Sequence, residues 1–318
     1  MIPQQSLKIF SGTSNVELTK KVCDYINIEM GKAEVDLFPD GETIVRVDDD
    51  VRGRDCFIIQ STCPPVNDNL MELLVFIDCL QRASANRITA VLPYFGYARQ
   101  DRKHAGRTPI SAKLVANLIT TARASRVLAI DLHADQVQGF FDIPVDHLTA
   151  EPVVVDYFRQ LDLPDIVLIS PDVGNVKTAN LFAQDLNGEL AVIDKRRISG
   201  STAVAQRIIG DVKDKNVLMF DDMITTAGTI CSAAHLACEH GARSIRVGAT
   251  HGIFAGPAVS RLSEAPIDEI VVTDTVPLNS GARTMKNLRV LTVSSLLGEV
   301  IQRIHHHQSV SEIFRKKF

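Results

Sequence analysis

Short apolar segments alternate with amphipathic helical patterns along the whole chain of 318 residues. The apolar runs predict strands at residues 56–60, 88–92, 127–130, 166–170, 190–193, 217–220, 244–249 and 269–273. Between them, apolar side chains recur at three- and four-residue spacing, as in Leu70, Leu73, Leu74 and Ile77, which is typical of helices. Near-continuous apolar strands that alternate with helices indicate parallel sheets buried on both faces. The sequence therefore predicts an α/β fold.

The succession of strands repeats once along the chain. Residues 57–61, 91–95 and 127–131 have counterparts at 167–171, 191–195 and 217–221, at offsets that shrink from 110 to 100 to 90 residues. A duplication followed by deletions gives this pattern. We expect two related α/β domains, residues 1–148 and 149–318, with the last helix packing back on the first domain and with ligands at the carboxyl ends of the strands.

Composition and charge exclude several classes of protein. Lys and Arg number 34 against 38 Asp and Glu, so the net charge of −4 gives no support to a nucleic-acid partner. No apolar run reaches membrane-spanning length and Met1–Leu7 is no signal peptide, so we expect a cytoplasmic protein without a membrane partner. The six cysteines form no CxxC pattern, which predicts free thiols, with Cys231 and Cys238 in the core.

The segment Val217–Thr229 predicts a phosphate site. Its apolar run ends in the adjacent carboxylates Asp221 and Asp222, which precede a small-residue loop and a helical pattern. A strand that leads into a helix N-terminus in this way offers free N–H groups and the helix dipole to phosphate. Carboxylates beside that phosphate hold sugar hydroxyls or Mg²⁺, so the segment indicates a ribose phosphate. The alternative is an ordinary turn with two solvated aspartates, but carboxylates at the end of a buried strand are costly without a ligand.

Two later loops have the composition of phosphoryl-transfer sites. Ser170–Lys177 follows a buried strand and precedes a helix, so it can cradle diphosphate with Asp172 near a metal, although its Pro-Asp-x-Gly pattern is also common in turns. Asp194–Arg197 ends the next strand. Lys195 and Arg197 can neutralise charge on transferring oxygens, and the alternative is a solvated turn.

The first half carries a basic, aromatic loop at Tyr94–Arg107. The loop is short and the chain is acidic, so a nucleoside triphosphate suits it better than nucleic acid, with Arg99 on phosphates and Gln100 near the base. A lone histidine such as His133 is more often a hydrogen-bonded structural residue than a metal ligand. The run His305–His307 follows a helical pattern and favours a solvated helix end over a metal site.

In chain order, these segments resemble those of ribose-phosphate diphosphokinases (phosphoribosyl diphosphate synthases) along essentially the whole chain. The matching blocks are Phe38–Glu42, Gln60–Cys63 with Asn67–Leu73, Pro93–Asp101, Pro109–Lys113, Asp131–Asp146, Ser170–Gly174, Asp194–Arg197 and Asp221–Thr229. The resemblance implies transfer of the diphosphoryl group of Mg-ATP to the C1 hydroxyl of ribose 5-phosphate, with release of AMP. It also implies two phosphoribosyltransferase-like domains, each a mainly parallel sheet covered by helices, a homo-oligomer, commonly a hexamer, and Mg²⁺ as cofactor.

The same resemblance implies roles for individual residues. Lys195 and Arg197 match the catalytic loop, and His133 and Asp172 match metal-associated positions, which reverses the local interpretation of His133. The residues that match ATP contacts are Arg99, Gln100 and Asp101, with Phe38, Asp40 and Glu42 offered to adenine by a neighbouring subunit. The ribose 5-phosphate positions are Asp221, Asp222, Thr225, Thr226, Ala227, Gly228 and Thr229. The positions aligned with regulatory phosphate or ADP sites are Arg52, Gln138, Asp146 and Ser309.

Several residues depart from the family pattern. Thr225 replaces an aspartate, Asn175 replaces a second glycine and Thr178 stands where a basic residue is common. One hypothesis is therefore an active enzyme, and the other is a non-catalytic paralogue that regulates an active synthase. The retained charged residues favour the enzyme. A simple phosphoribosyltransferase would explain Asp221–Thr229 but not the ATP-side segments.

Overall fold

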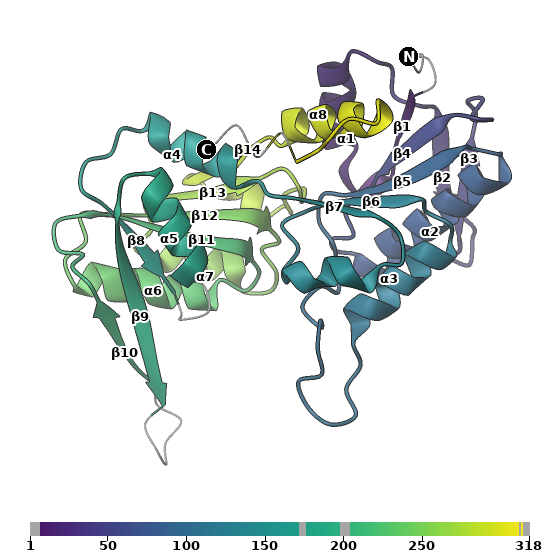
Figure 1. The fold of residues 1–318 in the computed structure, drawn as a ribbon. Helices are drawn as coiled ribbons and strands as arrows, with labels where there is room; N and C mark the ends of the chain where they lie inside the picture. The colour runs from purple at the N-terminus through teal and green to yellow at the C-terminus, as the bar shows by residue number, and fades with distance from the viewer. Residues whose placement is uncertain (1–6, 172–175, 198–203, 312, 314–318) are drawn as a thin grey trace. The chain divides into compact units, whose positions relative to one another are not determined.

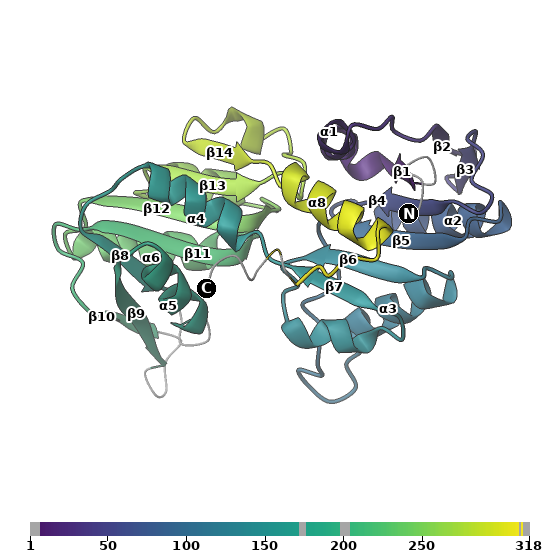
Figure 2. The same ribbon diagram turned by 45° about the horizontal axis from the view of Figure 1, so that its top comes forward.

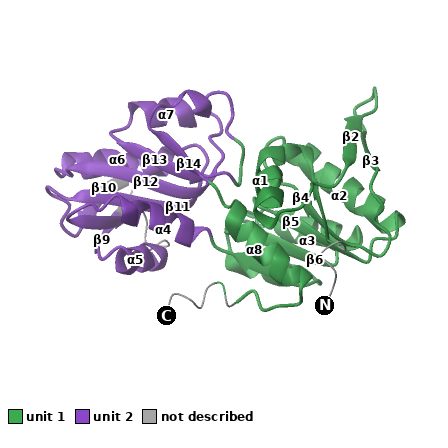
Figure 3. Ribbon diagram, turned by 90° about the horizontal axis from the view of Figure 1, so that it is seen from above, with its two compact units in different colours: residues 1–149, 275–277, 292–318 green, residues 150–274, 278–291 purple. Residues whose placement is uncertain are grey.

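The computed structural model describes residues 7–171, 176–197, 204–311 and 313, and for residues 195–197 and 204–206 it describes the backbone alone. The predicted metal residue Asp172 and the departure at Asn175 lie outside the described residues. The chain folds into two compact units (Figure 3). Unit 1 comprises residues 1–149, 275–277 and 292–318, and unit 2 comprises residues 150–274 and 278–291.

Unit 1 is built on a five-stranded parallel sheet of order β1-β4-β5-β6-β7. These strands are Leu7–Ser11, Asp55–Ile59, Arg87–Leu92, Arg126–Ile130 and Val145–Leu148. Helix α1 (Val16–Ile26) packs against α8 (Ser294–His305) on one face, and α2 (Val66–Arg82) and α3 (Ser111–Thr121) lie on the other (Figures 1 and 2). The short 3₁₀ helices of this unit are η2 (Thr13–Asn15) and η3 (Asp135–Phe140). A separate antiparallel hairpin joins β2 (Ala33–Leu37) to β3 (Thr43–Val47).

Unit 2 is built on a seven-stranded sheet of order β10-β9-β8-β11-β12-β13-β14. These strands are Val204–Ile209, Glu189–Arg197, Ile166–Ser170, Asn216–Ile224, Ser244–Gly252, Glu269–Thr273 and Leu288–Leu291, and only the β10–β9 pair is antiparallel. The helices are α4 (Glu151–Gln160), α5 (Val176–Asp185), α6 (Gly228–Glu239) and α7 (Ala258–Glu264), with the 3₁₀ helix η5 at Ala282–Thr284.

Alternate residues of β11 explain why its sequence is apolar throughout. Val217 and Met219 belong to the core formed with α6 and α7, whereas Leu218 and Phe220 belong to the core formed with α4 and α5. The Phe220 ring stacks on Phe182 of α5 with a centroid distance of 3.8 Å. Both faces of the sheet are therefore buried, which confirms the prediction of mainly parallel α/β sheets covered by helices.

Two strands run further than their apolar segments predict. β11 continues to Ile224 because β12 lies alongside it, with Asp221 opposite Ala249. β9 continues to Arg197 because β10 pairs with it beyond the end of the apolar run. The expectation that Asp221 and Asp222 follow the strand is therefore wrong, since both lie within it.

The solvated histidine run predicted at the end of α8 is wrong for its first member. The His305 side chain is only 1 % exposed, and its Nδ1 lies 2.7 Å from Oδ2 of Asp55 on β4. Asp55 also accepts hydrogen bonds from both Nε and Nη2 of Arg87 on β5, the former at 3.0 Å. His306 and His307 are exposed, as expected. This buried ion pair and histidine tie α8 to the sheet of unit 1.

All six cysteines are free thiols, as the sequence predicted. Cys23, Cys56, Cys63 and Cys231 are buried, but Cys238 is exposed on α6, so its assignment to the core was wrong. Burial raises the pKa of the Cys23 and Cys56 thiols to about 12 and that of Cys63 to about 11. None of the described helices is both long and apolar enough to span a bilayer.

These thiols should differ sharply in reactivity. We expect iodoacetamide at pH 8 to modify Cys238 in the native protein while Cys23, Cys56 and Cys63 stay unmodified, because a raised pKa removes thiolate and burial removes access. Peptide mass spectrometry after alkylation, with and without urea, measures this. Labelling of the three buried thiols as fast as Cys238 without urea would contradict the packing described.

Candidate functional site

The predicted phosphate loop of unit 2 joins the carboxyl end of β11 to the first turn of α6. Ala227, which precedes the helix, has a φ of 59°, a left-handed conformation uncommon for a residue with a side chain. Within the described part of the chain, the backbone N–H groups of Ala227, Gly228 and Thr229 have no hydrogen-bond acceptor. Unpaired N–H groups are a general property of a first helical turn. The strand–loop–helix order predicted for this segment is confirmed.

The backbone after β12 holds this loop in place. Ile253 and Phe254 N–H groups both donate to the Ile224 carbonyl, at 3.0 and 3.1 Å, and Ala255 N–H donates to Thr225 at 2.8 Å. Three hydrogen bonds to two successive carbonyls fix the point where the chain leaves β11. The loop is thus supported by the fold before any ligand binds.

The two carboxylates of this region are half-buried. Oδ1 of Asp221 accepts a hydrogen bond from the Asp222 N–H at 2.9 Å. Because a carboxylate that is partly removed from water needs compensating donors or cations, this end of β11 suits hydroxyl groups or a hydrated divalent cation. Asp221, Asp222 and residues 225–229 therefore gather in one continuous region of unit 2.

The predicted catalytic residues Lys195 and Arg197 lie on a two-stranded arm of unit 2 (Figure 1). β9 pairs with β8 only as far as Val192, and beyond it β9 continues with β10 as its partner. Asp194 and Arg207 face each other across this arm, with Nε and Oδ2 3.5 Å apart. The fold thus carries the backbone of Lys195 and Arg197 away from the sheet on its carboxyl side.

In unit 1 the loop after β5 contains the predicted ATP residues. Arg99 and Gln100 are exposed. The Gln100 side chain accepts a hydrogen bond from the Ser111 hydroxyl at the start of α3, and Asp101 accepts one from the Gln136 amide. Two neighbouring helices therefore fix the end of this loop and leave the Arg99 side chain toward solvent.

The loop after β6 places His133 on the same carboxyl side of the unit 1 sheet. His133 is exposed, and the Leu132 N–H beside it donates to Nε2 of His147 at 2.9 Å. Through this hydrogen bond His147 orients the loop that carries His133. Sequence reasoning missed His147, since nothing in its strand distinguishes it. Within the described residues, no cluster of three histidine, cysteine or carboxylate side chains could hold a metal.

Phe38, Asp40 and Glu42 form the tip of the β2–β3 hairpin. The Phe38 N–H donates to the Glu42 carbonyl at 2.8 Å, and Oδ1 of Asp40 accepts from the Glu42 N–H at 3.3 Å. Phe38 is 48 % exposed. An exposed aromatic ring at a hairpin tip is available to a ligand or to a second chain, and the predicted adenine contact remains a prediction.

The four predicted regulatory residues are spread over unit 1. Arg52 Nη1 donates to the Ser84 hydroxyl at 3.3 Å, Gln138 is exposed, and the Ser309 hydroxyl lies 2.9 Å from that of Ser311. Asp146 differs because its carboxylate accepts a hydrogen bond from Arg126 Nη1 at 2.5 Å and is largely buried. Its contact with Arg126 gives Asp146 a structural role in joining β6 to β7.

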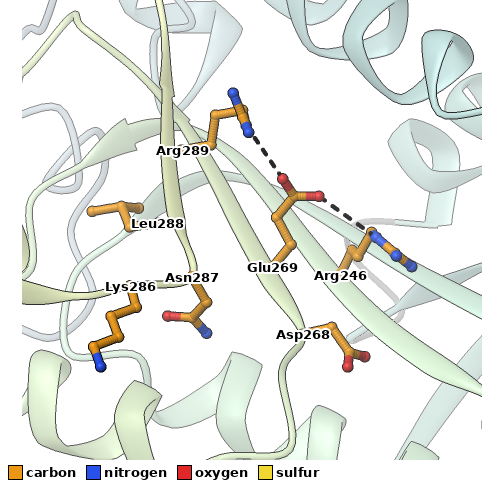
Figure 4. A pocket seen from close by; sticks show the side chains of 7 residues that line it. All are labelled: Arg246, Asp268, Glu269, Lys286, Asn287, Leu288 and Arg289. Atoms are coloured by element: carbon orange, nitrogen blue, oxygen red, sulfur yellow. Dashed lines mark ion pairs between the residues drawn. The ribbon is translucent and has the colours of Figure 1, made fainter.

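A polar cavity of about 290 Å³ lies at the amino ends of β12, β13 and β14, the opposite end of the sheet from the phosphate loop (Figure 4). Its lining residues are Arg246, Asp268, Glu269, Lys286, Asn287, Leu288 and Arg289. Glu269 pairs with Arg246 Nε at 3.5 Å and Arg289 Nε at 3.4 Å, and it accepts the Tyr157 hydroxyl. Burial and this carboxylate raise the pKa of Tyr157. The arginines and Glu269 compensate one another, so this network joins strands and is separate from the candidate site.

Comparisons with known proteins cover nearly the whole chain. Residues 7–122 match the family model of the N-terminal domain of ribose phosphate pyrophosphokinase, and residues 200–315 match the phosphoribosyl synthetase-associated domain. A ribose-phosphate pyrophosphokinase of Rhodopirellula baltica is 55 % identical over 98 % of this chain and 100 % of its own length. One from Chromobacterium violaceum is 51 % identical over 100 % and 97 %. The crystal structure of phosphoribosylpyrophosphate synthetase from Mycobacterium smegmatis is similar with a TM-score of 0.89 and 43 % identity, over 95 % of this chain and 99 % of that one.

Proposed function

Because this chain belongs to the ribose-phosphate pyrophosphokinase family, we propose that it transfers the diphosphoryl group of Mg-ATP to the C1 hydroxyl of ribose 5-phosphate, giving 5-phosphoribosyl 1-diphosphate and AMP. The observation that carries this proposal is the loop at residues 225–229, where free N–H groups follow two half-buried carboxylates at the carboxyl end of β11. That combination suits a sugar that carries a phosphate.

Ribose 5-phosphate binds at this loop in the proposed enzyme. The N–H groups of Ala227, Gly228 and Thr229 face the 5-phosphate, whose charge the N-terminal end of α6 stabilises. Asp221 and Asp222 accept hydrogen bonds from the ribose hydroxyls. These contacts fix the C1 hydroxyl for attack on the β-phosphorus of ATP, and such positioning, together with neutralisation of charge, is the main contribution that a protein makes to this kind of reaction.

Lys195 and Arg197 neutralise the charge that develops on the phosphoryl oxygens during transfer. The bond between the α,β-bridging oxygen and the β-phosphorus breaks and AMP leaves with that oxygen. The C1 oxygen forms the new bond to the β-phosphorus, and the proton of the C1 hydroxyl passes to water. The arm formed by β9 and β10 carries the backbone of both residues past the last residue pair of β9 with β8. Arg99, Gln100 and Asp101 hold the triphosphate and the nucleoside.

The residues present fit Mg²⁺. This ion favours oxygen ligands, keeps several waters and is usually bound by one or two carboxylates together with substrate phosphates. Asp221 and Asp222 supply half-buried carboxylates, and a fuller set of protein ligands is unnecessary for such an ion. His133 and Asp172 stay the metal-associated positions that the family resemblance implies. When bound, Mg²⁺ neutralises phosphate charge.

The proposed enzyme acts in the cytoplasm as a homo-oligomer, a hexamer, in which Phe38, Asp40 and Glu42 of one subunit contact the adenine bound by its neighbour. The exposed ring of Phe38 at the hairpin tip supports this arrangement. Arg52, Gln138, Asp146 and Ser309 stay the positions that align with regulatory phosphate or ADP binding in the family. Among these, Asp146 already has Arg126 as its partner.

AMP release by the purified protein tests the proposed function. With ATP and Mg²⁺ present, we expect AMP formation that requires ribose 5-phosphate, and we expect inorganic phosphate to change its rate. A folded, ATP-binding protein that forms no AMP under any of these conditions would favour the non-catalytic regulatory paralogue instead. The departure at Thr225 would then be the first position to restore.

Asp222→Asn tests the sugar contacts separately. Loss of a charge-assisted hydrogen bond to a ribose hydroxyl should raise KM for ribose 5-phosphate about tenfold and leave KM for ATP within twofold. Steady-state kinetics with each substrate varied in turn measure the two constants. An equal rise in both constants would place Asp222 outside the sugar site.

A further inference from the structure

Arg261 of α7 contacts the phosphate loop although it lies outside every segment that sequence reasoning selected. Its Nη1 donates a hydrogen bond to the Thr226 carbonyl at 3.0 Å. The same nitrogen lies 3.4 Å from the position that a Cβ at Gly228 would take, so the guanidinium packs against the backbone there. The side chain is exposed, and Thr226 is its one hydrogen-bond partner within the described part of the chain.

The contact between Arg261 and the Thr226 carbonyl also sets the direction of the Ala227 N–H, because both groups belong to one planar peptide. A trans peptide is planar, so its C=O and N–H groups point in opposite directions. The Thr226 carbonyl and the Ala227 N–H belong to one peptide. Because Arg261 holds the carbonyl on its own side, it directs the Ala227 N–H away from itself, and the cation polarises the peptide and strengthens that N–H as a donor.

We propose that Arg261 is a positioning residue for ribose 5-phosphate, which orients and polarises the Ala227 N–H that binds the 5-phosphate. This inference rests on the proposed function, because it takes residues 225–229 as the phosphate site. The left-handed conformation of Ala227 is unfavourable for a residue with a side chain, and the hydrogen bond from Arg261 to the preceding carbonyl stabilises the peptide that leads into it.

The loop should keep its course without Arg261. Its backbone is also held by the hydrogen bonds from Ile253, Phe254 and Ala255 to the carbonyls of Ile224 and Thr225, and none of these involves Arg261. An Arg261 substitution therefore frees a single peptide to rotate and leaves the core intact. This makes the effect on ligand binding separable from an effect on folding.

Three variants separate the roles of the hydrogen bond and the charge. We expect Arg261→Ala to raise KM for ribose 5-phosphate about tenfold, with KM for ATP and the melting temperature unchanged. Arg261→Lys, which keeps a charged donor, should recover most of the loss. Arg261→Gln keeps a donor without charge and should fall between them. Arg243→Ala, an exposed arginine at the amino end of β12 that pairs with Asp165 at 3.4 Å, is the control and should match the wild type.

Calorimetric titration with ribose 5-phosphate and with ribose measures binding without catalysis, so it tests the role of Arg261 separately from the proposed reaction. A wild-type protein that binds ribose 5-phosphate but releases no AMP would contradict the proposed reaction. The role of Arg261 could still be tested on that protein, because Arg261→Ala should weaken the binding of ribose 5-phosphate about tenfold and leave the binding of ribose unchanged. Arg261→Ala with wild-type affinity and KM for ribose 5-phosphate would overturn the inference. A wild-type protein that binds no ribose 5-phosphate would overturn both the role of Arg261 and the proposed reaction.

Discussion

Replacing Lys195 with alanine is expected to lower kcat for AMP formation by about 10²- to 10³-fold. The reaction moves a diphosphoryl group whose oxygens gain charge in the transition state, and a preorganised cation is worth most where that charge develops. Lys195 lies on the part of β9 that extends past its last residue pair with β8, so among the described strands β10 is the one that pairs with the lysine backbone. The loss should therefore appear in kcat, with little change in the melting temperature.

Steady-state AMP release at saturating ATP and ribose 5-phosphate measures the effect of Lys195→Ala. Lys213→Ala, which removes an exposed lysine of the same unit, is the matched control and should keep the wild-type kcat. A Lys195→Ala protein that folds normally and turns over at the wild-type rate would remove Lys195 from the catalytic machinery. A loss that appears only in KM for ATP would assign it to nucleotide binding.

Replacing Asp55 with asparagine is expected to lower the free energy of unfolding by about 3 kcal/mol. The Asp55 side chain is 6 % exposed and accepts hydrogen bonds from two nitrogens of Arg87, with His305 Nδ1 at 2.7 Å. The neutral asparagine leaves the Arg87 cation, whose side chain is 29 % exposed, without its buried carboxylate partner, and the cost of such an unpaired charge exceeds that of a lost surface pair. The attachment of α8 to the sheet should weaken as well, because His305 of α8 contacts the same carboxylate.

Urea denaturation followed by circular dichroism measures this change. Asp78→Asn is the control, because Asp78 pairs with Arg82 at 2.6 Å on the exposed surface of α2, where an ion pair contributes about 0–1 kcal/mol. Hydrogen exchange of α8 amides gives a local readout of the same contact. If Asp55→Asn is no more destabilising than Asp78→Asn, the buried ion pair contributes little to the fold.

The sequence carried enough information for the central strands and the phosphate loop. A strand buried on both faces has a continuous apolar run, and such runs located β4, β5, β6, β8 and β13 to within a residue. The lengths of β9 and β11 were underestimated because their extra residues are held by pairing with β10 and β12, which composition does not encode. Short edge strands such as β14, with exposed Arg289 and Val290, carry no comparable pattern.

Contacts between distant parts of the chain account for what sequence reasoning missed. His305 is buried because its side chain contacts the carboxylate of Asp55, which lies 250 residues away in the sequence. Arg261 reaches Thr226 from a helix that begins 30 residues after the start of α6, and no motif connects the two positions. His147 likewise acts on the loop of His133 through tertiary structure alone. By contrast, residues 221–229 are consecutive, and their chemistry is visible in the sequence.

The fate of the β-phosphorus of ATP tests the central claim most directly. The protein is incubated with ATP labelled at the β-phosphorus, Mg²⁺ and ribose 5-phosphate, and the products are separated. Diphosphoryl transfer predicts that the label enters 5-phosphoribosyl 1-diphosphate in amounts equal to the AMP released. Label that stays in ADP, or that enters free diphosphate whether or not the sugar is present, would contradict the proposed reaction.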